Sequence, residues 1–312
     1  MKTVFLFPGQ GSQQVGMLNA LPAGDPIVKA VFDDAESFLQ KTVLTLDTED
    51  ALTSTINVQL CLLIAGVISA RQLIHKGIQP DFVAGHSIGA FAAAVTSGAL
   101  SFKQAIKLVQ LRATLMQDAF PIDYGMTALI GFSENRLKPY LVRHNANHST
   151  VYLANINAAD QLIIAGRVDS MEILTGVLKR DGIQKIKRLK MPVPSHCELL
   201  AGVSEALRQA LEPMQLNQPA IPYASNSTGR LLKTVDAIRK DLWSSVSSTV
   251  KWYDATSLIY EYGARIFIEM QPAGVLTKIA ESTFPDIKAI AFNGDDIDRV
   301  YQLWNDFNTS KI

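Results

Sequence analysis

The chain has little cysteine and no excess of charge of either sign. Cys61 and Cys197 are the two cysteines among 312 residues, so a disulfide framework is excluded and both are expected to be thiols in a reducing compartment. Lys and Arg number 29, as do Asp and Glu, which gives zero formal charge. A nucleic-acid binder usually carries a basic excess, so that class is disfavoured and any charge-driven contact must come from a local patch.

Long apolar runs and targeting segments are also missing. The longest uncharged apolar run, Leu60–Ala70, is shorter than the roughly 20 residues that cross a bilayer. The apolar stretch Thr3–Phe7 leads directly into Pro8 and Gly9 without a small-residue cleavage site, which is typical of a strand and not of a signal peptide. We therefore expect a cytoplasmic protein that makes no use of a membrane.

Alternating strand and helix patterns indicate an α/β protein. Apolar strands are predicted at Thr3–Phe7, Phe82–Ala84 and Ala264–Glu269, with helical patterns between them, which favours a mainly parallel, hydrolase-like sheet with helices on both faces. Between residues 125 and 191 the pattern changes to a compact β-α-β, β-α-β order, ferredoxin-like in outline. The sequence therefore predicts a discontinuous large α/β domain at 1–123 and 192–312, interrupted by a small ferredoxin-like α+β domain at 124–191.

A serine bracketed by glycines follows the second predicted strand. Gly85-His86-Ser87-Ile88-Gly89 fits the pattern G-x-S-x-G, and an alanine-rich helix begins at Ala90. The two glycines permit a sharp, strained turn that exposes the serine hydroxyl at a helix N-terminus. That terminus offers unpaired N–H groups and a partial positive charge to an oxyanion, with the N–H of Ile88 first. The alternative is a simple turn with an idle serine; the strand–turn–helix context favours Ser87 as a nucleophile.

A serine nucleophile needs a base, and His196 is the best placed of the five histidines. It lies in a loop fixed by Pro192 and Pro194, which leads from the inserted domain back to the large one. His86 adjoins the serine, but the elbow is expected to direct it elsewhere, into packing. The other three have polar contexts typical of the surface: His75, His144 and His148. The alternative for His196 is a buried, hydrogen-bonded core histidine.

A second glycine loop, Pro8–Gln13, follows the first strand. It matches neither G-x-x-x-x-G-K-[ST] nor G-x-G-x-x-G, so phosphate or dinucleotide binding is unsupported. The backbone N–H of Gln10 is a candidate second donor to an oxyanion. Read alone, the loop is a turn.

One arginine interrupts an apolar helical stripe. Ser101 and Gln104 have capping-box spacing, and Arg112 lies on the same face as Ala105 and Leu108 in the helix that follows. A guanidinium on an inner face is costly unless it is paired or binds a ligand, and arginine binds carboxylates through two parallel hydrogen bonds. Arg112 is therefore a candidate site for a carboxylate-bearing substrate. The alternatives are an internal Asp or Glu partner, or a side chain that reaches out to solvent.

Taken in order, these motifs resemble the malonyl-CoA:acyl-carrier-protein transacylase family. The resemblance implies an S-malonyltransferase with this interrupted fold, no cofactor and no metal, and malonyl-CoA and an acyl carrier protein as partners. It makes Ser87 the malonylated nucleophile of a Ser-His dyad, in a ping-pong reaction, with His196 as base and later acid. The matching segments span nearly the whole chain: Phe7–Gln13, Gly85–Gly89, Arg112, Asn155–Asn157, Ile164–Gly166, Pro194–Cys197, Val250–Trp252 and Glu269–Pro272.

The same resemblance assigns the remaining site residues. The N–H groups of Gln10 and Ile88 would form the oxyanion hole, Arg112 would bind the malonyl carboxylate, and Gln59 would line the pocket. In the family a main-chain carbonyl orients the histidine, and the matching position here is Lys251.

Some stretches depart from the fatty-acid-synthesis members, many of which carry Glu where this chain has Ala90. These stretches resemble the transacylase (epsilon) subunit of bacterial malonate decarboxylase, which would make the decarboxylase carrier subunit the partner. The transacylase of fatty-acid synthesis is the alternative. The stretches are Tyr124–Met126, Ser225–Arg230, Asp236–Arg239 and Asp241–Leu242.

Other classes share parts of the pattern. A serine esterase or thioesterase of the α/β-hydrolase type should show a His-Gly-Gly-Gly-type loop and an acid between the serine and the histidine, and no such loop occurs. A patatin-like hydrolase needs a late Asp-Gly-Gly or Asp-Gly-Ala, and the later Asp-Gly is Asp181-Gly182-Ile183. A non-catalytic carrier-docking module predicts a missing nucleophile or base, and both are present.

A basic run on the inserted domain ends six residues before His196. Carrier proteins are typically acidic and CoA carries phosphates, so a basic cleft edge would attract either. The alternative is a solvated strand edge whose lysines discourage edge pairing. The run comprises Lys179, Arg180, Lys185, Lys187, Arg188 and Lys190.

Overall fold

The larger of two sheets has six strands in the order β10-β9-β1-β2-β7-β8. The computed structural model describes residues 1–119, 122–191, 193–294 and 296–309. Neighbouring strands of this sheet run parallel except β7 and β8, so the predicted mainly parallel α/β sheet is confirmed. The strands are β1 (Lys2–Phe7), β2 (Phe82–Gly85), β7 (Tyr223–Ala224), β8 (Leu231–Leu232), β9 (Ala264–Glu269) and β10 (Lys288–Ala291).

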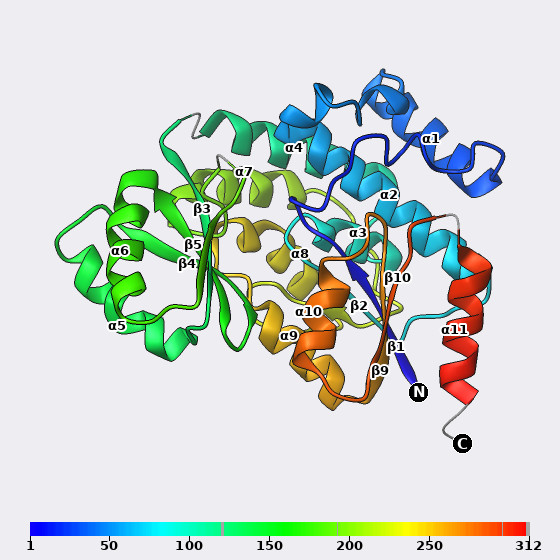
Figure 1. Cartoon of the computed structure of the whole chain (residues 1–312). Helices are drawn as coiled ribbons and strands as arrows, with labels where there is room; N and C mark the ends of the chain where they lie inside the picture. The colour runs from blue at the N-terminus through cyan, green and yellow to red at the C-terminus, as the bar shows by residue number, and fades with distance from the viewer. Residues whose placement is uncertain (120–121, 192, 295, 310–312) are drawn as a thin grey trace.

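Strand β1 shows why both faces of this sheet are covered. Phe5 and Phe7 point into one core, which α2, α3 and α4 help to build, whereas Val4 and Leu6 point into a second core beneath α9 and α10 (Figure 1). A strand buried on both faces is a continuous apolar run, as in the sequence. The helices are α1 (Pro26–Leu39), α2 (Thr55–His75), α3 (Gly89–Thr96), α4 (Phe102–Ala119), α7 (Ala201–Leu211), α8 (Val235–Ser244), α9 (Trp252–Glu261), α10 (Leu276–Thr283) and α11 (Ile297–Thr309).

Helix α2 is long and apolar enough to cross a membrane by length and composition alone, and 83% of its most apolar window is buried inside the protein. The prediction that no segment reaches this length was wrong, because it counted only Leu60–Ala70, whereas the stretch without a charged residue extends from Ala51 to Ala70. The burial is that of a core helix. Helices α1 and α7 and strand β8 lie where no element was predicted.

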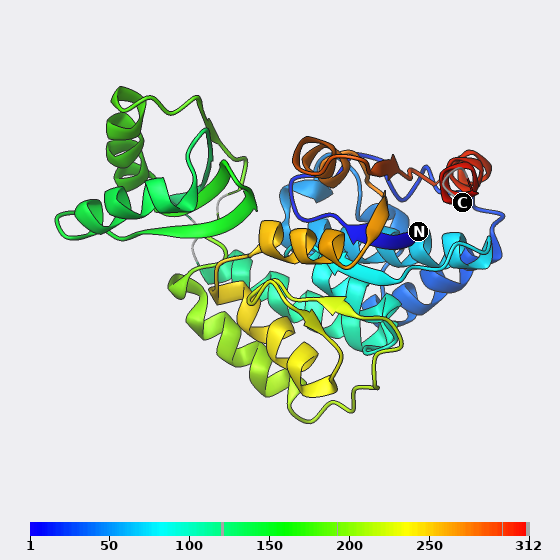
Figure 2. The ribbon, with the colours of Figure 1, turned by 90° about the horizontal axis from the view of Figure 1, so that it is seen from below.

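The second sheet has four antiparallel strands in the order β4-β5-β3-β6. Its chain order, β-α-β-β-α-β, is the predicted ferredoxin-like one. Figure 2 shows it as a lobe beside the large sheet. The elements are β3 (Tyr124–Ile130), α5 (Glu134–Asn145), β4 (Val151–Ala158), β5 (Gln161–Arg167), α6 (Val168–Arg180) and β6 (Lys185–Arg188). Domain limits at 123/124 and 191/192 stay a prediction, and Pro192 lies outside the described residues.

A short β-bridge ties the small sheet to the large domain. Val250, just before α9, donates its N–H to Ala154 O on β4 at 2.8 Å and accepts from Ile156 N–H at 2.9 Å. The hydroxyl of Thr249 donates to Leu153 O at 2.7 Å. Residues 249–250 therefore pair with the edge strand β4 and extend the four-stranded sheet by a short fifth segment.

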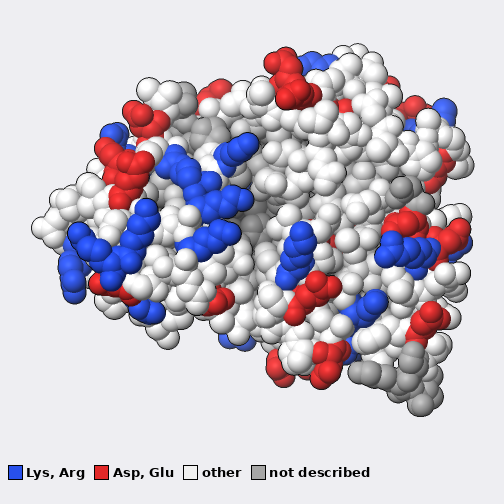
Figure 3. Space-filling view, in the orientation of Figure 1, with Lys and Arg blue, Asp and Glu red and all other residues white. Residues whose placement is uncertain are grey.

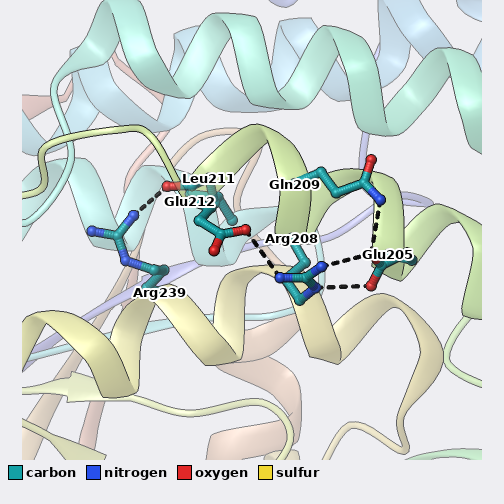
Figure 4. A network of polar contacts seen from close by, with 6 residues as sticks. All are labelled: Glu205, Arg208, Gln209, Leu211, Glu212 and Arg239. Atoms are coloured by element: carbon teal, nitrogen blue, oxygen red, sulfur yellow. Dashed lines mark hydrogen bonds and ion pairs between the residues drawn. The ribbon is translucent and has the colours of Figure 1, made fainter.

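Helices α7 and α8 are joined by an arginine (Figure 4). Arg239 on α8 donates from Nη1 to the carbonyl oxygens of Leu211, the last residue of α7, and of Met214. Leu211 O also accepts the N–H of Met214 at 3.1 Å, so the guanidinium adds a second donor at the end of α7 and a donor to the carbonyl of Met214. Arg208 pairs with Glu205 and Glu212 on the exposed face of α7, where such pairs add little stability. Helix α8, fixed in this way, leads into the 3₁₀ turn η4 (Ser245–Ser247).

Candidate active site

The predicted nucleophile occupies the turn between β2 and α3. Ser87 has φ +54°, in the left-handed region, where a non-glycine residue is strained. Both flanking glycines are sterically required. A Cβ on Gly85 would lie 2.1 Å from the backbone of Gly89, and one on Gly89 would lie 2.2 Å from Phe7 O. The strand–turn–helix setting expected around G-x-S-x-G is therefore present.

His196 follows the inserted domain in the sequence, whereas Ser87 precedes it, and the fold brings the two side chains together. Its Nε2 lies 2.7 Å from Ser87 Oγ, and its Nδ1 lies 2.7 Å from Ser245 O in η4. A carbonyl oxygen can only accept, so Nδ1 carries the ring proton and Nε2 is free to accept from the serine hydroxyl. The backbone N–H of His196 also donates to Val246 O at 2.9 Å. The turn η4 thus fixes both the position and the tautomer of the imidazole.

The prediction that Lys251 supplies the orienting carbonyl was wrong. Lys251 is the N-cap of α9, and its carbonyl oxygen accepts from Ala255 N–H at 3.0 Å in the first turn of that helix. The carbonyl of Ser245 comes to the imidazole instead, because α8 runs directly into η4 beside His196.

Burial governs the charge of His196. The side chain is 3% exposed, and burial lowers its pKa to about 3, with the positive Arg112 acting in the same direction. The imidazole is therefore neutral near pH 7, which is the form that accepts a proton.

Arg112 is a buried residue in the middle of α4, and this helix begins with the predicted capping box. Ser101 N–H donates to Gln104 Oε1 at 2.9 Å, and Gln104 N–H donates to Ser101 Oγ at 3.2 Å. The Arg112 guanidinium, 2% exposed, donates from Nη1 to Gln59 Oε1 at 2.5 Å and from Nη2 to Ser87 Oγ at 3.1 Å. Burial lowers its pKa to about 10. No carboxylate in the described part of the chain pairs with it, so the guanidinium presents a buried positive charge at the serine.

The loop that carries Gln10 packs against the elbow. Strands β1 and β2 end side by side, with Phe7 opposite Gly85. A Cβ on Gly9 would lie 2.8 Å from His86 Nδ1. Gln10 Oε1 lies 3.5 Å from Nε2 of Gln59, the residue that also holds Arg112. Within residues 1–119, 122–191, 193–294 and 296–309, no acceptor pairs with the main-chain N–H of Gln10 or of Ile88. Both N–H groups are available to a negatively charged oxygen.

His86 is directed away from the reacting atoms, toward the small domain. Its Nε2 lies 3.1 Å from Asn157 Oδ1 on β4, and its ring packs edge-on against Trp252. Burial lowers its pKa. The surface position predicted for His144 was wrong, because α5 packs beside α6 and buries the ring against Ser170.

Sequence reasoning missed three residues around the dyad: Ser245, Asn226 and Asp241. Ser245 acts through its main chain, which leaves no side-chain signal. Asn226 and Asp241 lie in stretches noticed only as resemblances, and they approach the elbow only after folding. In the described part of the chain, no group of three or more His, Cys, Asp or Glu side chains could hold a metal ion.

The chemistry that this arrangement supports is transfer of an acyl group through an ester on serine. The serine sits on an α/β scaffold with a small second sheet, beside a neutral imidazole and a buried positive charge. Fold and site together define an enzyme that acylates a serine, as serine acyltransferases and serine hydrolases do.

Comparison with known proteins agrees with that class. The acyl transferase domain family matches residues 4–299. The chain is 32% identical to the malonyl CoA-acyl carrier protein transacylase of Bacillus subtilis (strain 168), over 93% of each protein. It is 33% identical to the enzyme of the same name from Haemophilus influenzae, over 94% of this chain and 95% of that one. The chain therefore belongs to the malonyl-CoA:acyl carrier protein transacylase family.

Solved structures agree in fold. The malonyl CoA-acyl carrier protein transacylase (fabD) of Coxiella burnetii matches with a TM-score of 0.91 and 30% identity, over 96% of each chain. The malonyl-transacylase PlMCAT, solved in complex with the type II polyketide synthase acyl-carrier protein AntF, matches with a TM-score of 0.91 and 31% identity, over 98% of this chain and 100% of that one.

Proposed function

We propose that the protein moves a malonyl group from malonyl-CoA to the thiol of an acyl carrier protein through a malonyl ester on Ser87. The observation that carries the proposal is the Ser87–His196 pair at 2.7 Å beside the guanidinium of Arg112, which has no carboxylate partner in the described residues. Membership in the family indicates which groups react: the acyl group is malonyl, and the two thiols are those of CoA and of the acyl carrier protein.

In the first half-reaction, His196 Nε2 takes the proton of Ser87 Oγ while that oxygen attacks the thioester carbonyl. Negative charge develops on the carbonyl oxygen, and the N–H groups of Ile88 and Gln10 stabilise it. The C–S bond then breaks, and the CoA sulfur leaves with the proton held on Nε2. The product is malonyl-Ser87 with a neutral histidine.

In the second half-reaction, the carrier thiol loses its proton to His196 and attacks the ester carbonyl of malonyl-Ser87. The same two N–H groups stabilise the same charge. Collapse breaks the ester bond, and Ser87 Oγ regains the proton from Nε2. Both halves use one nucleophile and one base, which is the basis for a ping-pong scheme.

Arg112 selects the acyl group in this scheme. Its Nη2 now contacts the neutral hydroxyl of Ser87, and its Nη1 contacts the neutral carboxamide of Gln59. The free malonyl carboxylate would provide the negatively charged partner that the guanidinium lacks, through charge-assisted hydrogen bonds. Gln59 holds the guanidinium in the required orientation.

The test is incubation with malonyl-CoA alone, followed by intact-mass and peptide analysis. A stable malonyl adduct on Ser87, absent in Ser87→Ala and present in the exposed control Ser282→Ala, supports the proposal. Release of free malonate without an adduct supports an esterase or thioesterase, and no reaction supports a docking module; either outcome contradicts the proposal. With a carrier added, parallel double-reciprocal plots are expected, and intersecting ones would contradict the ping-pong order.

For the carrier, we propose the acyl carrier protein of fatty-acid synthesis, because the relatives over most of the chain carry the name malonyl CoA-acyl carrier protein transacylase. The narrower alternative is the carrier subunit of malonate decarboxylase. It is favoured by Ala90 in place of Glu and by the stretch Ser225–Arg230. Transfer rates to the two purified carriers separate these readings.

The buried free thiols of Cys61 and Cys197 are compatible with a cytoplasmic, reducing setting, which we also propose.

We also propose that the carrier docks on the basic side of the small sheet. Lys187 lies opposite Ala128 in the β3–β6 register, on the sheet face whose apolar residues contact Cys197, the neighbour of His196. Lys185 shares this face, since it lies two residues away on the strand. Figure 3 shows Lys and Arg gathered on the small domain beside the hollow between the two lobes. All six residues of the predicted basic run are exposed.

A further inference from the structure

The side chain of Asn226 spans the nucleophile elbow. Its Oδ1 accepts the N–H of Ser87 at 2.9 Å, and its Nδ2 donates to Gly85 O at 2.8 Å. Asn226 is 3% exposed and comes from the loop after β7, far from the elbow in sequence. One carboxamide therefore holds the backbone on both sides of His86.

The Asn226 carboxamide makes sheet-like hydrogen bonds to the chain after β2, at the point where the main-chain pairing of β2 with β7 ends. Strand β2 pairs with β7 through Val83–Tyr223 and Ala84–Ala224, and no further pair follows. The C=O of one residue and the N–H of the second residue after it face the same side of an extended strand. An amide side chain has the donor and acceptor of a peptide group, so Asn226 supplies the next two hydrogen bonds at the point where the chain bends into the turn.

A buried carboxylate holds Asn226 in place. Asp241 on α8 is 2% exposed and accepts the N–H of Asn226 at 3.1 Å through Oδ2. It also accepts the hydroxyls of Tyr223, Ser225 and Ser227, and the N–H of Ser227. No Lys or Arg in the described ranges pairs with it, so neutral donors alone satisfy its charge. Five hydrogen bonds to one carboxylate fix residues 223–227 as a unit.

This unit determines where the reactive oxygen lies. The φ of Ser87 is strained, and a strained residue persists only where its surroundings hold it. The bond from Ser87 N–H to Asn226 also occupies a donor at the elbow, leaving that of Ile88 for an oxyanion. We propose that Asn226, anchored by Asp241, is a positioning residue that keeps Ser87 Oγ within reach of His196 Nε2. The inference rests on Ser87 being the nucleophile proposed above.

The decisive variant is Asn226→Asp, assayed by the rate at which a neutral fluorophosphonate labels Ser87. Ionised, the aspartate accepts from Ser87 N–H but loses the donor to Gly85 O. Protonated, it regains that donor. Displacing a reacting atom by about 1 Å can cost about 100-fold, so we expect labelling about 10- to 100-fold slower at pH 8 and substantial recovery as the pH falls toward 5. The wild type should show no such recovery.

Asn226→Ala serves as the second variant and Ser204→Ala as the matched control. Ser204 is also buried and bonded to a main-chain carbonyl, that of Trp243. Asn226→Ala should lower kcat for malonyl transfer with KM for malonyl-CoA within about threefold, because Arg112 and Gln59 are untouched. Labelling within about twofold of wild type at every pH overturns the inference, as does a loss matched by a smaller folded fraction in melting curves. Failure of the wild type to form a malonyl adduct would instead overturn the proposed function.

Discussion

Arg112 and His196 converge on a single oxygen. The guanidinium donates to Ser87 Oγ at 3.1 Å, and the imidazole Nε2 lies 2.7 Å from the same atom. The positive charge of Arg112 helps to lower the pKa of His196, although burial is the larger cause. The group that would bind the substrate anion therefore also helps burial to keep the base in its neutral, proton-accepting form.

The pH dependence of serine reactivity follows from this pair. Because the pKa of His196 lies far below 6.5, the histidine stays neutral as the pH falls through the range in which an ordinary histidine becomes protonated. Labelling of Ser87 by a neutral fluorophosphonate should therefore stay flat from pH 8 to about pH 5 and decline only at lower pH. A midpoint near pH 6.5 would contradict the burial argument.

Stability should already change between pH 6.5 and 5, where the reactivity of Ser87 is expected to stay flat. The unfolded chain takes up a proton on His196 below its ordinary pKa of 6.5, and the folded chain does so only near 3, so the unfolded state binds more protons between these values. His196 therefore lowers the free energy of unfolding as the pH falls below 6.5. Urea titrations at pH 7 and pH 5 should show a larger loss for the wild type than for His196→Gln. Equal losses would contradict the assignment.

Arg112→Ala should discriminate between acyl groups. Charged hydrogen bonds are worth roughly 1.5–3 kcal/mol, so kcat/KM for malonyl-CoA should fall about 10- to 100-fold, while that for acetyl-CoA should hold or rise. Single-turnover acylation with the two thioesters measures the difference. Equal losses for both would mean that Arg112 only supports the fold.

Gln59→Glu tests the same charge without removing it. The new carboxylate would lie where Gln59 Oε1 now accepts from Arg112 Nη1, and would serve as the missing counter-ion. Acylation by malonyl-CoA should weaken while labelling of Ser87 by a neutral reagent is kept. Undiminished malonyl-CoA kinetics would show that the guanidinium does not bind the acyl carboxylate.

Charge reversal on β6 tests carrier docking. Lys185→Glu with Lys187→Glu is the informative pair, because Arg188 lies on the other face of the strand, opposite Thr127, and donates to Tyr124 O. Transfer to the carrier should slow most at low ionic strength, where steering is strongest, and acylation by malonyl-CoA should change less. Lys29→Glu with Lys41→Glu, on and just after the distant α1, is the control. Equal effects of the two pairs at low salt would rule out a specific docking face.

Side-chain patterning made much of this fold predictable, and the misses share a cause. The apolar run of β1 and the glycines of the elbow are required by the structure immediately around them, so they are visible in the sequence. The large sheet and the small lobe were likewise predictable from the spacing of apolar residues. Arg112 was identifiable because a charge interrupts an apolar stripe. Ser245 was not, because a main-chain oxygen is common to every residue and only the path of α8 brings this one to the imidazole. Asp241 likewise resembles any surface carboxylate until folding surrounds it with donors.

The segment from Ser245 to Lys251 has a mechanical consequence. At one end its carbonyls hold His196, in the middle it pairs with β4, and at the other end Lys251 N–H donates to Asn226 O at 2.7 Å. The small sheet is thereby joined, through one seven-residue segment, to the carbonyls that hold His196 and to Asn226, which accepts the N–H of Ser87. Base and nucleophile are therefore tied to the small domain by the same stretch of chain, so neither is held by the large domain alone.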